Sequence, residues 1–466
     1  MVPLFSVCLV VDIIYGDIGW SNFLTFTLPL VTSMLLLIPH IVRGEPERSP
    51  RKGYKYKIAM GTFVYIVLLS SLPFMISGFG MPPAAIFEST AGLTTTGLST
   101  GSRGDFLELS RGLLFFRCAI QWVGGIYYLV LAFMILADIN DLAKRSVDQR
   151  MLSRIGVVPR LGSLLTNVAI LYVLFTFVSF ILLSITGMPI YDALCQSLGT
   201  VSGGGFGANG RYIDRGIGLH MLLVPIMIMA GVGYYVHMSV FSARGRMKSL
   251  FDTENIFYWT AVITAPIIAV MILSFSNYSV GESLWKGIFS AISALTTTGF
   301  MIEGMTEWPD SLRYLLLLLM LVGGSSLSVA SGLKMQRILL LTKGFMGEVE
   351  RSSHPRAVIT LRRGTGTYSE NALEAATVTF FYLFGALSAC VLFLLIFHEG
   401  IMDVISLSVT AISNGGIAYG QFSGPEGISS LNWAPKLLLV LVMFLGRFDF
   451  LLPLYFLTPR TYRFSG

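Results

Sequence analysis

The chain contains few charged residues. Asp, Glu, Lys and Arg make up 12% of its 466 residues, whereas about a quarter of a soluble globular protein is normally charged. Hydrophobic residues make up 54%. This composition argues against a soluble domain and predicts a polytopic membrane protein whose apolar segments cross the bilayer.

Cysteine and histidine are also scarce, with four and five residues. The cysteines are scattered through apolar stretches without a CxxC spacing, and the histidines do not cluster. Neither a zinc site nor a disulfide framework is therefore expected. The sequence also lacks HExxH and any nucleotide-binding motif, so neither enzyme activity nor an organic cofactor is predicted.

The basic residues lie mostly in linkers on one side of the predicted spans. The formal net charge is +6, and 21 of the 32 Lys and Arg residues fall in these linkers and in the C-terminal tail. This asymmetry predicts that the basic side is cytoplasmic, and it gives no reason to expect nucleic-acid binding. The linkers are Arg43–Lys57, Lys144–Arg160, Arg244–Lys248 and Lys343–Arg363, and the tail carries Arg460 and Arg463.

Four short motifs that contain glycine follow apolar stretches. They are T-T-T-G at Thr94–Gly97, V-S-G-G at Val201–Gly204, T-T-T-G at Thr296–Gly299 and S-N-G-G at Ser413–Gly416. Successive final glycines are 107, 95 and 117 residues apart, which predicts four copies of one structural unit. Thr/Gly loops inside a membrane suit a cation filter, because their backbone carbonyls can replace the water around an ion. The alternative for any single motif is close helix packing by small residues.

Each predicted unit contains a long span, a short apolar helix, the glycine motif and a second long span. The short helices have about ten residues, or roughly 15 Å, so they are predicted to be re-entrant. Four such units predict an all-α, pseudo-fourfold pore. The units are 56–140, 141–245, 246–345 and 346–466, preceded by an extra helix pair at 1–55 whose first helix, 3–19, is weakened by Asp12 and Asp17. The expected spans are 21–42, 56–78, 110–137, 163–186, 218–243, 256–275, 312–342, 372–398 and 433–457, and the expected short helices are Pro83–Leu93, Ile190–Thr200, Glu282–Leu295 and Ile401–Ile412.

The segment 312–342 is too long for one straight crossing. Its middle reads G-G-S-S-L-S-V-A-S-G at Gly323–Gly332, and eight of these ten residues are Gly, Ser or Ala. Glycine destabilises a helix by up to about 1 kcal/mol relative to alanine. The helix is therefore predicted to break here, and a packing seam of small residues is the alternative.

Five polar side chains fall within apolar segments. Lys334 and Arg447 are cations where charge is costly, which indicates either a functional site or snorkelling to the headgroups. Glu88 is expected to tie the first short helix in a structural role. Arg117 and Gln121 are four residues apart on one helix face, and we expect them to brace the filter from behind.

Seven sequence motifs extend over nearly the whole chain. They are F-E-S-T-A-G-L-T-T-T-G at Phe87–Gly97, Q-W-V-G-G at Gln121–Gly125, T-V-S-G-G-G-F at Thr200–Phe206, T-T-T-G-F at Thr296–Phe300, G-L-K at Gly332–Lys334, H-P-R-A-V at His354–Val358 and L-G-R at Leu445–Arg447. Together they resemble the TrkH branch of the Trk/Ktr/HKT superfamily of K⁺ transporters.

The resemblance implies four K⁺-channel-like units per subunit of a homodimer, with one pore in each subunit. It implies that backbone oxygens just before each filter glycine bind K⁺, and that the broken segment blocks the pore from inside. The implied ion-binding residues are Thr95, Thr96, Ser202, Gly203, Thr297, Thr298, Asn414 and Gly415; the filter glycines are Gly97, Gly204, Gly299 and Gly416; and the gate residues are Gly323, Gly324, Ser325, Ser326, Ser331, Gly332, Lys334 and Arg447. In the family a serine at the first filter glycine accompanies Na⁺ transport, so Gly97 favours K⁺.

Two positions depart from the family pattern. Gly203 and Gly415 stand where larger residues are usual, and glycine adds backbone freedom. A less selective K⁺/Na⁺ channel is therefore an alternative to a K⁺ uptake channel. A Na⁺- or H⁺-coupled secondary transporter is a further alternative, because such carriers also contain repeats and broken helices, but the four motifs lack the acidic residue expected at such a binding site.

The resemblance also implies a location and partners. The chain is expected in the cytoplasmic (inner) membrane, surrounded by lipid, with its filter toward the outside. A cytosolic TrkA-like subunit that binds nucleotides is expected to dock on three of the basic linkers, Arg43–Lys57, Lys144–Arg160 and Lys343–Arg363. K⁺ is the only small ligand that the resemblance implies.

Overall fold

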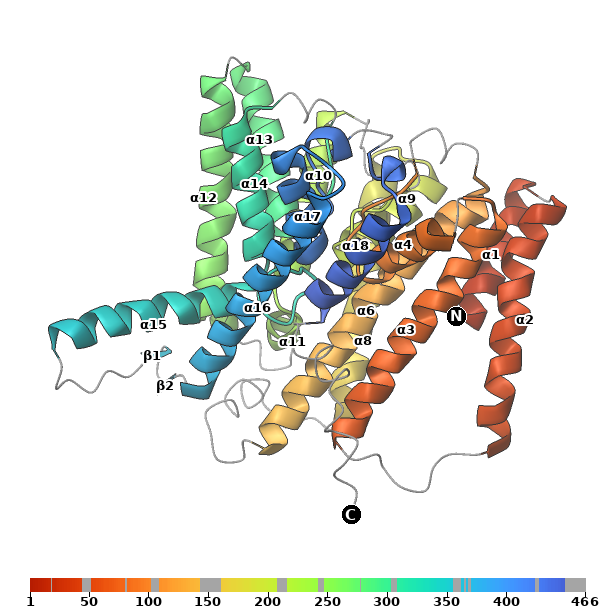
Figure 1. Cartoon of the computed structure of the whole chain (residues 1–466), viewed down its shortest axis with the longest axis horizontal. Coiled ribbons are helices and arrows are strands. Elements are labelled where there is room, and N and C mark those ends of the chain that lie inside the picture. The colour runs from red at the N-terminus through yellow and green to blue at the C-terminus, as the bar shows by residue number, and fades with distance from the viewer. Residues whose placement is uncertain are drawn as a thin grey trace.

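A computed structural model of the chain shows a bundle of helices (Figure 1), which confirms the predicted all-α fold. It describes residues 1–17, 19–43, 52–79, 82–101, 109–142, 161–207, 216–241, 247–276, 278–302, 308–354, 362–363, 366–367, 370–423 and 427–448. In these parts the longest helices are α2 (Trp20–Arg43), α3 (Lys52–Ile76), α6 (Arg111–Leu142), α8 (Leu161–Ile185), α12 (Thr253–Phe275) and α16 (Glu370–Leu394). The only strands described are β1 (Arg362–Arg363) and β2 (Gly366–Thr367), which pair in antiparallel fashion.

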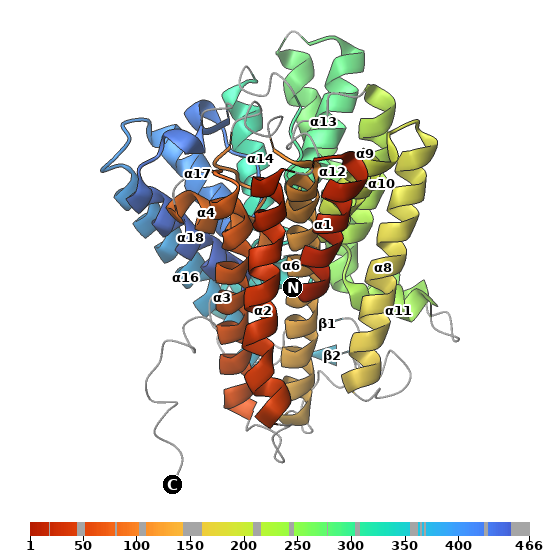
Figure 2. The same ribbon diagram turned by 90° about the vertical axis from the view of Figure 1, so that its right-hand side faces the viewer.

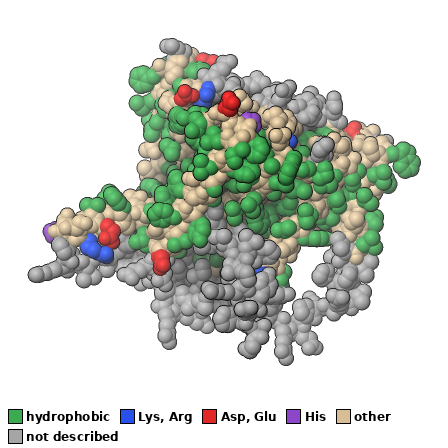
Figure 3. Space-filling view, in the orientation of Figure 1, with side chains coloured by type: hydrophobic (Ala, Val, Ile, Leu, Met, Phe, Trp, Pro, Cys, Tyr) green, Lys and Arg blue, Asp and Glu red, His purple; other side chains and the backbone are tan. Residues whose placement is uncertain are grey.

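Five described helices contain segments long and apolar enough to cross a membrane. The segments are Lys55–Ile76, Arg111–Leu136, Gly162–Ile185, Thr253–Phe275 and Ala372–Leu394. Only 22% of the most apolar window of Ala372–Leu394 is buried within the protein, so most of that helix faces outward. Hydrophobic side chains accordingly cover much of the face drawn in Figure 3. An apolar surface of this extent is stable in lipid and costly in water, which confirms that the chain is a membrane protein.

The first helix, α1 (Val2–Tyr15), is short and packs against α2 and α6. Asp12 in α1 and Asp17, two residues after the end of α1, hold the beginning of α6. The backbone N–H of Gly112 donates to Asp12 Oδ1 at 2.6 Å, and that of Arg111 donates to Asp17 Oδ2 at 2.9 Å. These carboxylates satisfy N–H groups that the first turn of a helix leaves unpaired, so the two residues that weaken one helix stabilise another.

Four short helices of 12 to 16 residues lie between the long ones. They are α4 (Pro82–Leu93), α9 (Ile190–Ser202), α13 (Val280–Leu295) and α17 (Ile401–Ser413). Each packs against the helix before it and the helix after it. Figures 1 and 2 place them in the upper half of the molecule, whereas α2 and α6 end, and α3 and α8 begin, at the lower side. The four predicted short helices therefore exist, with bounds close to those expected.

The sequence predicts a span over 218–243, and the structure shows a sharp break within it that was not predicted from the sequence. Residues in this region form α10 (Ile217–Gly231) and α11 (Tyr234–Phe241), whose axes are bent by 93°. Val232 between them is extended, with φ −81° and ψ 141°. A Cβ added to Gly233 would lie less than 3.0 Å from the carbonyl oxygen of Ser326. Glycine at this turn is what allows the chain to approach another backbone.

The predicted break in 312–342 is confirmed. Helix α14 (Asp310–Val322) ends at Gly323, and α15 (Met335–Ser353) begins after Lys334. We call residues 323–334 the gate loop. Helix α15 projects away from the bundle in Figure 1 instead of continuing α14. The last described helix is α18 (Trp433–Arg447), and the predicted continuation of this span to residue 457 lies outside the described residues.

Candidate functional site

Each of the four short helices leads directly into a buried loop. The threonines of the first loop, Thr94, Thr95 and Thr96, have no exposed surface, and those of the third loop, Thr296–Thr298, are at most 1% exposed. Loops buried at this depth need partners for their backbone groups. The hydrogen bonds that satisfy these backbone groups determine much of the geometry of the site.

The four loops share one backbone conformation. Their first position lies in the left-handed region, with φ between 50° and 70°, and a glycine two residues later has φ between 71° and 78°. The N–H of this glycine donates to the carbonyl six residues earlier in Gly97, Gly205 and Gly299. The first positions are Thr95, Gly203, Thr297 and Asn414, and the later glycines are Gly97, Gly205, Gly299 and Gly416. We call this second set the ring glycines.

These torsion angles correct the prediction for the second loop by one residue. The sequence motif suggested Gly204 as the filter glycine, with Ser202 and Gly203 before it. In the structure Gly205, not Gly204, has the left-handed φ of the other ring glycines, and Ser202 is the last residue of α9. The residues equivalent to Thr95 and Thr96 are therefore Gly203 and Gly204.

The loops form a closed ring in chain order. A Cβ added to any ring glycine would lie at 3.0 Å or less from a carbonyl oxygen of the next loop. Real side chains do not tolerate such distances, so each loop lies edge to edge with its neighbour. The approaches run from Gly97 to Gly204, from Gly205 to Thr298, from Gly299 to Gly415 and from Gly416 back to Thr96.

The ring is electrostatically suited to a cation. The C-terminal ends of the four short helices lead into the ring, and the C-terminal end of a helix carries partial negative charge. The loops contain no Asp or Glu between residues 94–99, 203–207, 296–302 and 414–419. The negative potential that these loop residues offer a cation therefore comes from the partial charges of backbone carbonyls and helix ends, and not from carboxylates.

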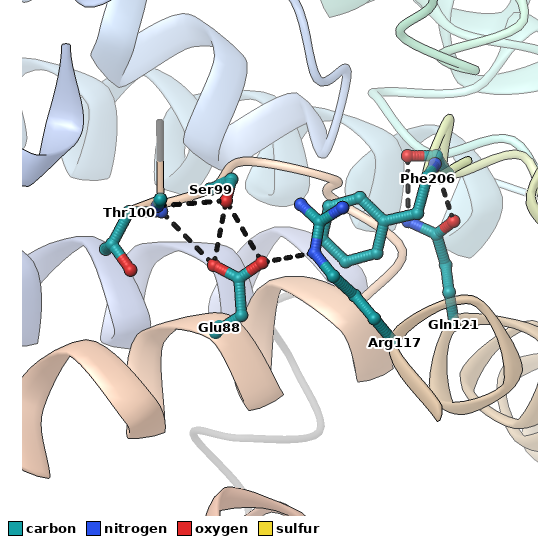
Figure 4. Close-up of polar contacts among 8 residues, drawn as sticks. Glu88, Ser99, Thr100, Arg117, Gln121 and Phe206 are labelled. Atoms are coloured by element: carbon teal, nitrogen blue, oxygen red, sulfur yellow. Dashed lines mark hydrogen bonds and ion pairs between the residues drawn. The ribbon is translucent and has the colours of Figure 1, made fainter. Parts of the chain in front are cut away.

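A buried ion pair supports the first loop from behind (Figure 4). The Arg117 side chain on α6 donates to Glu88 on α4 at 2.5 Å, and both residues are at most 1% exposed. The same carboxylate accepts hydrogen bonds from the hydroxyl of Ser99 and the N–H of Thr100, just after the loop. The Arg117 guanidinium lies 3.5 Å from the centre of the Phe206 ring in the second loop. The expected structural roles of Glu88 and Arg117 agree with these contacts.

Replacing Glu88 with alanine is expected to destabilise the protein strongly. It would leave Arg117 buried without its carboxylate, and breaking a buried ion pair costs about 3–5 kcal/mol. The measurement is the thermal unfolding midpoint in detergent. Glu348→Ala is the control, because it removes the partner of Arg351 from an exposed pair on α15 that contributes little. Equal midpoints for the two variants would contradict the structural role of Glu88.

Side chains also join neighbouring loops. Gln121 Nε2 donates to the carbonyl oxygen of Gly204 at 2.8 Å, and Gln121 Oε1 accepts from the N–H of Phe206 at 3.0 Å. Figure 4 shows both bonds from one side chain amide. Asn414 Nδ2 of the fourth loop donates to Thr96 Oγ1 of the first at 2.6 Å. Gln121 is thus the brace that its position predicts, and Asn414 closes the ring between its last and first members.

The gate loop lies directly against this ring. The N–H of Ser331 donates to Thr297 Oγ1 at 2.8 Å. A Cβ added to Gly203 would lie 3.3 Å from a side-chain methyl of Val329. Both Val329 and Ser331 are buried. A segment in contact with two of the four loops is placed where it can obstruct a path through the ring.

Two buried cations hold one limb of the gate loop. Arg447 Nη1 on α18 donates to the carbonyl oxygen of Val329 at 2.9 Å and to Ser331 Oγ at 2.6 Å. Lys334 Nζ donates to the carbonyl oxygens of Ser328, at 3.3 Å, and of Ala330. Both cations are at most 5% exposed, so they do not snorkel to the membrane surface. The structure therefore brings together the two cations and the loop that the sequence singled out.

Comparison with known proteins identifies the family. A family model described as TrkH, cation transport protein, matches residues 56–457. The chain belongs to the TrkH family of cation transport proteins. It is 30% identical to the Trk system potassium uptake protein TrkH of Salmonella typhimurium, over 97% of this chain and 94% of that protein. The TrkH protein of Halomonas elongata is 27% identical over 98% and 95% of the two chains.

The fold also agrees with a solved member of the TrkH family. The crystal structure of the potassium transporter TrkH from Vibrio parahaemolyticus superposes with a TM-score of 0.86, at 24% identity, and covers 99% of this chain and 96% of that one.

Among the described residues, no group of three His, Cys, Asp or Glu side chains could hold a metal ion.

Some sequence predictions lie outside the described residues of this TrkH family member. These are the linker 144–160, most of the linker 43–57, Arg244 and Arg246, residues 355–358 of the H-P-R-A-V motif, residues 449–457 of the last span, and Arg460 and Arg463. Sequence reasoning missed Gly205 and the break after Gly231. The G-V-G sequence at 231–233 is the signal that could have found the break.

Proposed function

We propose that this chain conducts K⁺ into the cell through the ring of four loops. The observation that carries the proposal is the closure of the ring. Each loop contacts the next and the fourth contacts the first, so the four loops surround a common axis. Relatives that match nearly its whole length are named potassium uptake proteins. The division into units 56–140, 141–245, 246–345 and 346–466, after a helix pair at 1–55, follows from the same proposal.

Backbone oxygens are the proposed ligands of K⁺. We assign this role to the two residues before each ring glycine, because the loops have equivalent torsion angles there. Backbone carbonyls in a filter replace the hydration shell of an ion. The assigned residues are Thr95, Thr96, Gly203, Gly204, Thr297, Thr298, Asn414 and Gly415.

The two unusual glycines favour a selective filter over a loose one. Gly203 adopts φ 70°, the conformation that Thr95 and Thr297 adopt despite their side chains. A Cβ added to Gly415 would lie less than 3.0 Å from the sulfur of Met320 on α14. Both glycines are thus packed in positions where their backbone freedom is restricted. This packing supports K⁺ selectivity, and the less selective channel becomes an outcome of the test below.

The proposed orientation places the ring toward the outside of the cytoplasmic membrane. The ends of α2, α3, α6 and α8 that border basic linkers lie at the lower side in Figure 1, opposite the short helices. The positive-inside rule assigns the basic side to the cytoplasm. In this orientation the gate loop lies on the inner side of the ring, where closing it would stop inward flux.

We further propose that the chain works as a homodimer with a cytosolic nucleotide-binding subunit. Relatives are named as parts of a Trk system, and this name supports further subunits. The basic linkers on the proposed cytoplasmic side are the docking surface that charge favours.

Rubidium uptake into proteoliposomes tests the proposed function. We expect ⁸⁶Rb⁺ uptake by the purified protein under a K⁺ gradient, inhibited by external K⁺ at much lower concentration than by Na⁺. Protein-free liposomes give the background. Equal inhibition by the two ions would indicate a general monovalent-cation channel. Uptake that requires a Na⁺ or H⁺ gradient would contradict channel conduction and favour a coupled carrier.

A further inference from the structure

The first part of the gate loop is held by its own set of hydrogen bonds, separate from those of Arg447. Glu254 Oε1 accepts the backbone N–H of Ser326 at 2.6 Å and the hydroxyl of Ser325 at 3.0 Å. The neighbouring Asn255 Oδ1 accepts from the same hydroxyl at 3.4 Å. Glu254 and Ser325 are at most 1% exposed. An acidic side chain thus holds residues 325–326, whereas Arg447 holds residues 329–331.

The position of Glu254 explains how a charge is tolerated there. It is the second residue of α12, and the first turn of a helix stabilises a carboxylate through the helix dipole. Its other oxygen, Oε2, makes no hydrogen bond within the described residues. The carboxylate therefore depends on the gate loop for the hydrogen bonds that offset its burial. Moving the loop away would remove these bonds, which favours the closed position.

The α10–α11 break completes this side of the attachment. The N–H of Ser325 donates to the carbonyl oxygen of Gly231 at 3.0 Å, and the N–H of Tyr234 donates to that of Leu327 at 2.9 Å. Tyr258 on α12 donates to the carbonyl oxygen of Ile228, close to the break, at 2.9 Å. The start of α12 and the α10–α11 break therefore both hold the gate loop in place through hydrogen bonds.

The same turn of α12 is joined to the preceding linker. Helix η1 (Met247–Phe251) precedes α12, and its residues bond to α12 side chains. Asn255 Nδ2 donates to the carbonyl oxygen of Ser249 at 2.6 Å, and Trp259 Nε1 to that of Leu250 at 3.2 Å. A displacement of η1 would consequently move Glu254 with it.

We propose that Glu254 is a positioning residue that keeps the gate loop closed, and that η1, through its hydrogen bonds to α12, helps to hold Glu254 in place. This inference rests on the proposed function, because it needs the gate loop to control flux. Arg447 and Glu254 then act as opposite anchors on the two limbs of one loop. Release of either limb opens the path.

The experiment is basal ⁸⁶Rb⁺ uptake by the purified chain without a partner. We expect Glu254→Ala to raise uptake about tenfold or more, because it removes two hydrogen bonds to a charged acceptor. Glu254→Gln should return uptake toward the wild-type level, since its amide oxygen can still accept both bonds. Glu282→Ala is the control, because Glu282 also lies in the first turn of a short helix and forms a capping box away from the gate loop.

A double-mutant cycle separates gate positioning from general stability. Ser325→Ala removes one of the two donors and should raise uptake slightly in the wild-type background but not in Glu254→Ala. A purely structural role would lower the unfolding midpoint of Glu254→Ala and leave basal uptake unchanged, which would overturn the inference. Absence of uptake in every variant, including Arg447→Gln, would instead count against the proposed function.

Discussion

Replacing Gly205 with alanine is expected to reduce ⁸⁶Rb⁺ uptake at least about tenfold. Gly205 has φ +73°, where a residue with a side chain is strained by roughly 1–2 kcal/mol. Its Cβ would also lie less than 3.0 Å from the carbonyl oxygen of Thr298. Relief of this contact would displace a carbonyl oxygen that we assign to K⁺. The measurement is ⁸⁶Rb⁺ uptake, and an unchanged unfolding midpoint would show that the lost uptake comes from the ring and not from unfolding.

This variant also decides between the two registers of the second loop. If Gly204 were the filter glycine, as the sequence motif suggests, Gly205 would correspond to Leu98 and Phe300, and a side chain would be tolerated. Gly218→Ala is the matched control, because nothing lies within 4 Å of the Cβ that it would add. Wild-type uptake in both variants would show that the register in the structure is incorrect.

The second loop shows how easily the sequence alone misplaces this register. Three successive glycines, 203–205, allow two alignments with the T-T-T-G motifs, and only the phenylalanine that follows Gly205, as Phe300 follows Gly299, favours one of them. The decisive information is the backbone torsion angle and the approach to Thr298 in another unit. In the other three loops a single pattern fits, and their ring glycines are those that the sequence predicts.

The broken helices show the same contrast between local and distant information. The gate loop was predictable, because eight small residues in ten weaken a helix wherever they occur. The break after Gly231 has only a Gly-Val-Gly sequence as a local signal. The backbone that packs against this break is that of Ser326, far along the chain. Glu254 was missed for a similar reason, since an acidic residue at the beginning of a span is also expected at a membrane surface.

Arg447→Gln is expected to raise basal ⁸⁶Rb⁺ uptake about tenfold or more. The substitution removes the guanidinium that donates to the carbonyl of Val329 and to Ser331 Oγ, and it removes a positive charge beside a cation pathway. Hydrogen bonds to charged groups contribute about 1.5–3 kcal/mol each, and 1.4 kcal/mol corresponds to a tenfold change in an equilibrium. The free-energy difference that favours the closed position of the gate loop over the open one should therefore become much smaller.

Arg447→Lys separates the two contributions of this side chain. Lysine keeps the charge but lacks the planar fork of donors that arginine presents. If hydrogen-bond geometry holds the loop, both variants raise uptake; if charge repels the ion, only Arg447→Gln does. Lys436→Gln is the control, because it removes a cation from the same helix, where the ammonium donates to the carbonyl oxygen of Ser429 at 3.0 Å. Lower or unchanged uptake by Arg447→Gln, from protein with a wild-type unfolding midpoint, would contradict a gate held by Arg447.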